Sequence, residues 1–132
     1  MPDDLLARSY FNPETGKRDY KSLPEDESLR AARNREATAR FCWSPYMHNP
    51  KLKGRLHRIN IPTLFLWGTA DRIIGDGYGR AYCAMIPGAQ FQPIERAGHY
   101  PHIEQPEEFA RRALAFADSG AKAPAKTSAK AG

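Results

Sequence analysis

The stretch IPTLFLWGTADRII, residues 61–74, decides the fold. Residues 63–67 form a short unbroken apolar run, and Gly68 closes it. The run is too short for a typical helix and is rich in strand-forming residues, so it predicts a strand buried on both faces. Asp71 follows directly beyond the end of this predicted strand.

A second short strand is predicted at about residues 90–94, and His99 follows directly beyond its end. The spacing of 28 residues from Asp71 to His99 accommodates one helix and one strand. Such a unit returns the second strand parallel to the first, so both loops open at the same carboxyl edge of the sheet, where ligands bind in open α/β folds. An acid and a histidine so placed are two of the three members of a nucleophile–histidine–acid triad.

Three motifs carry a resemblance to a known family: P-T-L-F-L-W-G-x-x-D, I-P-G-A and A-G-H-x-P-H-x-E-Q-P-E-E-F. In this order and spacing, over roughly residues 43–118, they resemble the C-terminal part of the α/β-hydrolase fold superfamily. The resemblance implies an α/β fold class and a partial α/β-hydrolase fold: part of the cap, the last two parallel strands and their flanking helices. It also implies that Asp71 is the triad acid and His99 the general base, with no cofactor.

The family's nucleophile should precede the acid in a G-x-S-x-G elbow, and this motif is nowhere in the chain. Ser9, Ser44 and Ser119 lack the small flanking residues that allow a strained strand-to-helix turn. Cys42 and Cys83 fall within predicted helices. We therefore predict that this chain does not contain the nucleophile and is not active alone.

Two other interpretations of these residues stay open. Asp71 could simply cap the next helix while His99 is an ordinary loop histidine. A metal site could use His99 and His102, which are three residues apart, with Glu95 and Glu104 nearby. Pro101 lies between the two histidines and disfavours a helix that presents both, and zinc usually needs a third positioned ligand, so we expect no metal.

The chain has 132 residues, whereas a complete α/β hydrolase needs about twice as many. A helix is predicted from residue 24 to about residue 42, with a thin apolar stripe, and another from about residue 106. The predicted division is 1–58, a cap-domain remnant and return helix; 59–119, the C-terminal part of the α/β-hydrolase core; and 120–132, a disordered basic tail.

Composition favours a soluble globular protein, with 41% hydrophobic and 27% charged residues. The net charge of +5 comes with no RNA- or DNA-binding motif and no aromatic–basic interleaving, so we predict no nucleic-acid partner. No apolar run approaches the roughly 20 residues of a membrane helix, and the start has no secretory signal. We therefore expect a cytoplasmic protein with two reduced thiols and no membrane partner.

Two functions are compatible with the sequence. In the first, the chain is the C-terminal part of a hydrolase that acts on an ester, epoxide or similar small molecule. In the second, it is a non-catalytic or degenerate fragment that docks on a separate N-terminal half or a related subunit. Two strands of a sheet that should hold many more bury less apolar surface, so we expect the chain alone to be marginally stable. An exposed apolar strand edge also invites pairing with another chain, so we expect it to be aggregation-prone.

Overall fold

The computed structural model describes residues 3–19 and 21–120. These residues form two compact units: residues 3–17 and 55–120 belong to the first, and most of residues 18–54 belong to the second. This differs from the expected division at residue 58, because residues 3–17 pack with the strand-containing part rather than with the segment that follows them. The predicted disorder of the tail falls on residues outside those described, apart from Gly120.

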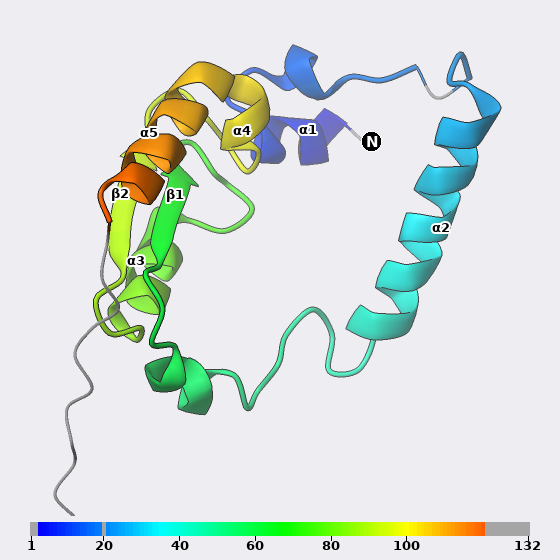
Figure 1. Cartoon of the computed structure of the whole chain (residues 1–132). Helices are drawn as coiled ribbons and strands as arrows, with labels where there is room; N and C mark the ends of the chain where they lie inside the picture. Colours follow the sequence, from blue (N-terminus) through cyan, green and yellow to red (C-terminus); the bar gives the residue numbers. More distant parts are fainter. Residues whose placement is uncertain (1–2, 20, 121–132) are drawn as a thin grey trace, which may run out of the picture. The chain divides into compact units, whose positions relative to one another are not determined.

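The first unit is built on two parallel strands, β1 (Leu64–Gly68) and β2 (Gln90–Ile94), as predicted. The two strands lie side by side in Figure 1. Their register pairs Leu64 with Gln90 and Gly68 with Ile94. The helical elements of this unit are α1 (Asp3–Ser9), η1 (Pro13–Gly16), η2 (Lys53–Arg58), α3 (Asp76–Ala84), α4 (Pro101–Glu104) and α5 (Pro106–Asp118).

Helix α3 covers one face of the sheet. Phe65 and Trp67 alternate onto this face, where the Phe65 ring lies 5.6 Å from the Tyr82 ring, measured between centroids. Gly79 is buried, and a Cβ there would come within 2.7 Å of the Trp67 ring and 3.0 Å of the Phe91 ring. The missing side chain at residue 79 therefore permits the close approach of α3 to both strands.

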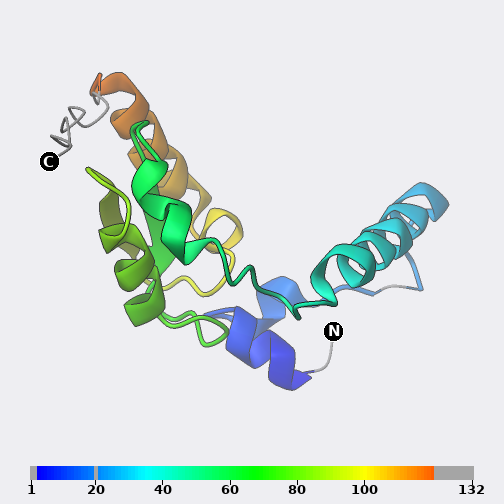
Figure 2. The same cartoon turned by 90° about the horizontal axis from the view of Figure 1, so that it is seen from below.

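Helix α5 lies on the other face of the sheet (Figure 2). Its Phe109, Ala113 and Phe116 line an open groove of about 500 Å³ together with residues 64–67 of β1. Among the described residues, β1 pairs with β2 alone, so its second edge is open. Residues 64–67 are consequently only half-buried, and the prediction of a strand buried on both faces was wrong for this chain.

One arginine anchors α5 to β2. Arg112 Nη1 donates to the Pro93 carbonyl at 2.7 Å, and Arg112 Nε donates to Glu108. Hydrogen bonds from Arg111, which has the larger effect, and from Arg112 hold the pKa of the Glu108 carboxyl below its ordinary value. The N-terminal half of α5 is thus fixed against the end of β2 that leads to His99.

The interior of the first unit is small. Its buried apolar residues are Leu6, Leu56, Cys83, Ile86, Ile94 and Ala97. Burial raises the pKa of the Cys83 thiol, which therefore serves as a core side chain. Leu6, in α1 near the start of the chain, is thus part of this core.

The second unit contains helix α2 (Glu25–Cys42), whose bounds match the predicted helix. None of its residues is buried, in agreement with its thin apolar stripe. Trp43 and Tyr46 follow α2 and remain 75% and 78% exposed.

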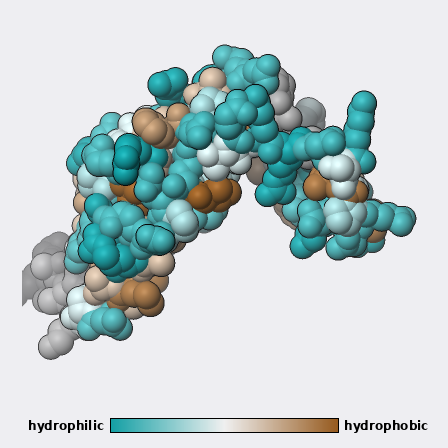
Figure 3. Space-filling view, turned by 90° about the horizontal axis from the view of Figure 1, so that it is seen from above, coloured by the Kyte–Doolittle hydropathy of each residue, from teal (hydrophilic) through white to brown (hydrophobic). Residues whose placement is uncertain are grey.

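The face of the molecule visible in Figure 3 is mostly hydrophilic, with scattered hydrophobic patches. Among the described residues, no helix is both long and apolar enough to cross a membrane.

The two glycines of α3 give a matched test of the close approach at residue 79. Gly79→Ala should destabilise the chain by about 1–3 kcal/mol, because the methyl group must displace the rigid Trp67 ring. Gly77→Ala, where a Cβ would meet nothing within 4 Å, should be neutral or stabilising by up to about 1 kcal/mol. Urea denaturation measures both, and equal midpoints for the two variants would contradict this packing.

Candidate active site

Asp71 lies three residues beyond β1 and is held by the backbone of its own turn. Its Oδ1 accepts hydrogen bonds from the N–H groups of Ile73 (2.8 Å) and Ile74 (3.0 Å). Trp67 Nε1 donates to the Ile74 carbonyl at 3.2 Å and fixes the far end of this turn. The Asp71 side chain is 4% exposed. Asp71 therefore caps the turn at residues 71–74, while the N-cap of α3 is Gly75.

The second oxygen of Asp71 faces His99. Asp71 Oδ2 lies 2.9 Å from His99 Nδ1, and the His99 side chain is 32% exposed. An ionised carboxylate can only accept a hydrogen bond, so this geometry assigns the proton of the neutral imidazole to Nδ1. Nε2 is then left as the basic nitrogen. Such a nitrogen can accept a proton from a nucleophile brought within hydrogen-bond reach.

The two site loops approach each other at glycines. A Cβ on Gly68 would overlap the carbonyl oxygens of Ala97 and Gly98, so only glycine fits at the end of β1. The Thr69 N–H donates to the Ile94 carbonyl at 3.0 Å, and the Ala70 N–H donates to the Ala97 carbonyl at 2.9 Å. These backbone bonds join the Asp71 loop to the His99 loop at one edge of the sheet.

The N-terminal segment supports both site loops, which was not predicted from the sequence. The Arg72 N–H donates to the Arg8 carbonyl at 3.1 Å, and the His99 N–H donates to the Ser9 carbonyl at 2.6 Å. Ser9 is 3% exposed, and α1 packs against both site loops. The apolar side chains of Leu6, which is buried, and of Tyr10, whose ring lies 5.1 Å from the Tyr100 ring, were the available signals for packing here. The hydrogen bonds gave none, since they involve backbone atoms that any residue possesses.

The structure does not assemble the metal site considered from sequence. Glu95 Oε2 accepts from the Thr69 hydroxyl at 3.1 Å, His102 is exposed, and the Glu104 carboxylate accepts backbone N–H groups. Within residues 3–19 and 21–120, no group of three or more His, Cys, Asp or Glu side chains could hold a metal ion.

None of the candidate nucleophiles occupies a strand-to-helix elbow. Ser9 ends α1, and Ser119 follows α5 with its hydroxyl donating to the Phe116 carbonyl at 2.7 Å. Cys83 is buried within α3. Ser44 and Cys42 belong to the second unit.

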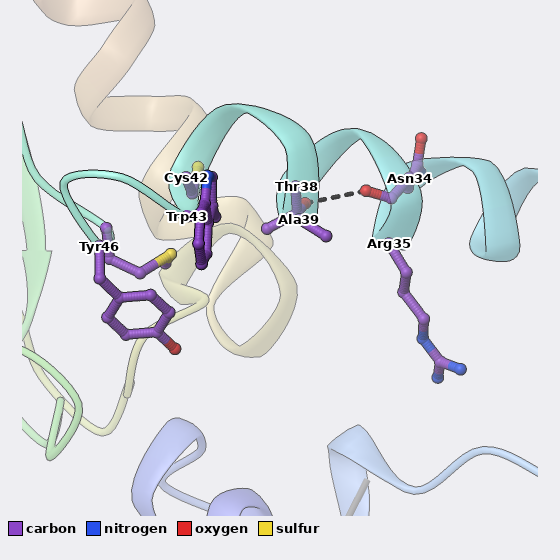
Figure 4. Close-up of a pocket in the computed structure, with 8 residues that line it drawn as sticks. Asn34, Arg35, Thr38, Ala39, Cys42, Trp43 and Tyr46 are labelled. Atoms are coloured by element: carbon purple, nitrogen blue, oxygen red, sulfur yellow. Dashed lines mark hydrogen bonds between the residues drawn. The ribbon is translucent and has the colours of Figure 1, made fainter.

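The second unit has a hollow of its own, of about 620 Å³ (Figure 4). It lies along the C-terminal half of α2 and the turn that follows. Its lining residues are Asn34, Arg35, Thr38, Ala39, Cys42, Trp43, Tyr46 and Met47. This lining contains neither an acid nor a histidine. The contact between Asp71 and His99 lies in the first unit.

The chain is similar in sequence to known proteins. A family model described as "Alpha/beta hydrolase family" matches residues 2–112. The 2-hydroxy-6-oxononadienedioate/2-hydroxy-6-oxononatrienedioate hydrolase of Cupriavidus pinatubonensis is 37% identical over 62 residues, which cover 47% of this chain and 22% of that protein.

Two solved structures share part of the fold. A thermophilic esterase from Thermogutta terrifontis is 32% identical, with a TM-score of 0.52 over 55% of this chain and 27% of the esterase. A CIB-like hydrolase from Thermoplasma acidophilum is 33% identical, with a TM-score of 0.51 over 53% of this chain and 34% of that hydrolase. The chain thus spans about a third or less of the length of each of these relatives.

Proposed function

Because the chain belongs to the α/β-hydrolase family, we propose that Asp71 and His99 are the acid and general base of a catalytic triad whose nucleophile lies outside these 132 residues. The observation that carries this proposal is the 2.9 Å contact between Asp71 Oδ2 and His99 Nδ1. Two loops that are separated by 28 residues deliver these side chains to one edge of the sheet.

In this mechanism His99 Nε2 takes the proton of the nucleophile as the nucleophile attacks the substrate, and it later returns a proton to the leaving group. Asp71 keeps the imidazole in the required tautomer and stabilises the imidazolium that forms. The turn bonds from Ile73 and Ile74 hold one carboxylate oxygen, so the other is directed at His99.

The substrate class is proposed from the relatives. They are named as a hydrolase of oxo-dienedioates and an esterase. We propose a small-molecule substrate with an ester-like, epoxide or other carbon-centred bond, and a reaction that needs no cofactor.

The open edge of β1 supports a second candidate function. The groove beneath α5 and the half-buried residues 64–67 leave room for another strand and its side chains. If the nucleophile is carried by a separate polypeptide, this edge would dock that polypeptide, because an unpaired edge strand offers a row of backbone donors and acceptors.

The proposal predicts that this chain alone hydrolyses a chromogenic ester no faster than buffer does, because His99 has no nucleophile to activate. Turnover that is abolished by His99→Ala would contradict the absence of a nucleophile.

Translation of the DNA upstream of Met1 in the same frame separates the two functions. A G-x-S-x-G or G-x-D-x-G elbow there supports the single hydrolase, whereas a stop codon with no such motif nearby favours the docking fragment.

A further inference from the structure

Glu104, the last residue of α4, binds three backbone N–H groups with one carboxylate. Its Oε2 accepts from Gly98 N at 2.7 Å and from Phe11 N at 3.1 Å, and its Oε1 accepts from Asn12 N at 2.9 Å. Hydrogen bonds to an ionised acceptor are stronger than those between neutral groups. Glu104 therefore joins the loop that precedes His99 to a segment more than 85 residues earlier in the chain.

The same early segment also binds the next residue of the loop. The His99 N–H donates to the Ser9 carbonyl at 2.6 Å. A Cβ on Gly98 would overlap this carbonyl, so the two backbones are in direct contact. Glu104 holds Gly98 while Ser9 holds His99, and the two bonds together fix the peptide from which the imidazole projects.

The backbone before this peptide is in an unfavourable conformation. Arg96 has a φ of 53°, in the left-handed region that non-glycine residues seldom adopt. Its carbonyl accepts from Gln105 Nε2 at 3.2 Å. The loop therefore depends on tertiary contacts, and Glu104 and its neighbour Gln105 make two of them, beside the bonds to Ser9 and Ala70.

We propose that Glu104 is a positioning residue for the acid–base pair. By tying Gly98 to residues 11 and 12, it sets the distance at which His99 Nδ1 meets Asp71. This inference rests on the proposed role of His99 and adds the group that places it. The bonds of this carboxylate go to backbone N–H groups, while the imidazole bonds to Asp71, so the action of Glu104 is transmitted through the backbone.

Glu104→Gln tests this role in the chain as it exists. The amide places N–H donors where the carboxylate received them, so at least one of the three bonds must be lost. The matched control is Glu107→Gln, which changes an exposed carboxylate in the first turn of α5 that makes no side-chain hydrogen bond to the residues described. Both variants lose one negative charge from the same part of the fold.

Two NMR measurements follow the consequence. Amide hydrogen exchange reports the bonds to Gly98, Phe11 and Asn12, and we expect about tenfold or faster exchange at one or more of them in Glu104→Gln. Long-range ¹H–¹⁵N spectra at about pH 8, where an ordinary imidazole is neutral, report the ring tautomer. The wild type and Glu107→Gln should show His99 protonated at Nδ1, and Glu104→Gln should show a mixture of both tautomers.

Faster exchange at Gly98 with an unchanged His99 tautomer would overturn the proposal and leave Glu104 a structural residue. If Glu104→Gln does not fold, Glu104→Asp keeps the charge on a shorter side chain and is judged by the same two measurements. Failure of both variants to fold would also overturn it, because Glu104 would then support the whole fold. Neither measurement needs turnover, so the proposed function fails separately. A protein that joins this chain to its nucleophile and is inactive, with His99 still protonated at Nδ1, would contradict the proposed function and leave the role of Glu104 standing.

Discussion

Replacement of His99 by alanine, in a protein that joins this chain to its nucleophile, is expected to lower kcat by about 10⁴-fold or more. The reason is that, among the residues that the structure describes, no other histidine lies within hydrogen-bond distance of Asp71. Asp71→Asn should lower kcat by a similar factor of about 10⁴, because the amide can donate to Nδ1 and so favours the wrong tautomer. Ester hydrolysis under substrate saturation measures both effects.

His102→Ala is the matched control for His99→Ala. His102 is exposed, and its ring contacts are with Tyr100 and Phe109, at centroid distances of 6.2 and 5.9 Å. Its loss should change kcat by no more than about threefold, since surface substitutions of this kind cost little. A His99→Ala enzyme as active as His102→Ala would remove His99 from the mechanism.

The sequence predicted the elements that position this pair. A short apolar run closed by glycine is a strong local signal, and β1 lies within one residue of the strand that this run predicted. The second strand, predicted at about residues 90–94, is β2. The parallel pairing and the approach of Asp71 to His99 followed from the length of the intervening segment, since one helix must return the second strand beside the first. Both predictions depended on spacing and pattern, which a single sequence displays.

The contacts of residues 3–12 could not be predicted in this way. Their hydrogen bonds to the site loops and to Glu104 are made by backbone groups at Arg8, Ser9, Phe11 and Asn12, and a backbone carbonyl or N–H carries no residue-specific signal. Glu104 was visible in the sequence, but only as a carboxylate near two histidines, which suggested a metal ligand. Its partners are backbone N–H groups at Phe11, Asn12 and Gly98, which only the folded chain brings together.

Ile94→Ala is expected to have the largest effect on stability. Ile94 ends β2, is 0% exposed, and accepts the Thr69 N–H through its carbonyl, so it lies under both site loops. Truncating a fully buried isoleucine leaves a cavity and costs about 2–5 kcal/mol. Whole domains are stable by about 5–15 kcal/mol, and this one has half-buried strands, so the variant should be largely unfolded at 37 °C.

Ile61→Ala provides the same chemical change at a site that is 63% exposed. It should shift the midpoint of urea denaturation by an amount equivalent to less than about 0.5 kcal/mol. Circular dichroism at increasing urea concentration distinguishes the two variants. If Ile94→Ala were no less stable than Ile61→Ala, the end of β2 would not be the packed centre of this unit. The loops with Asp71 and His99 would then need a different support.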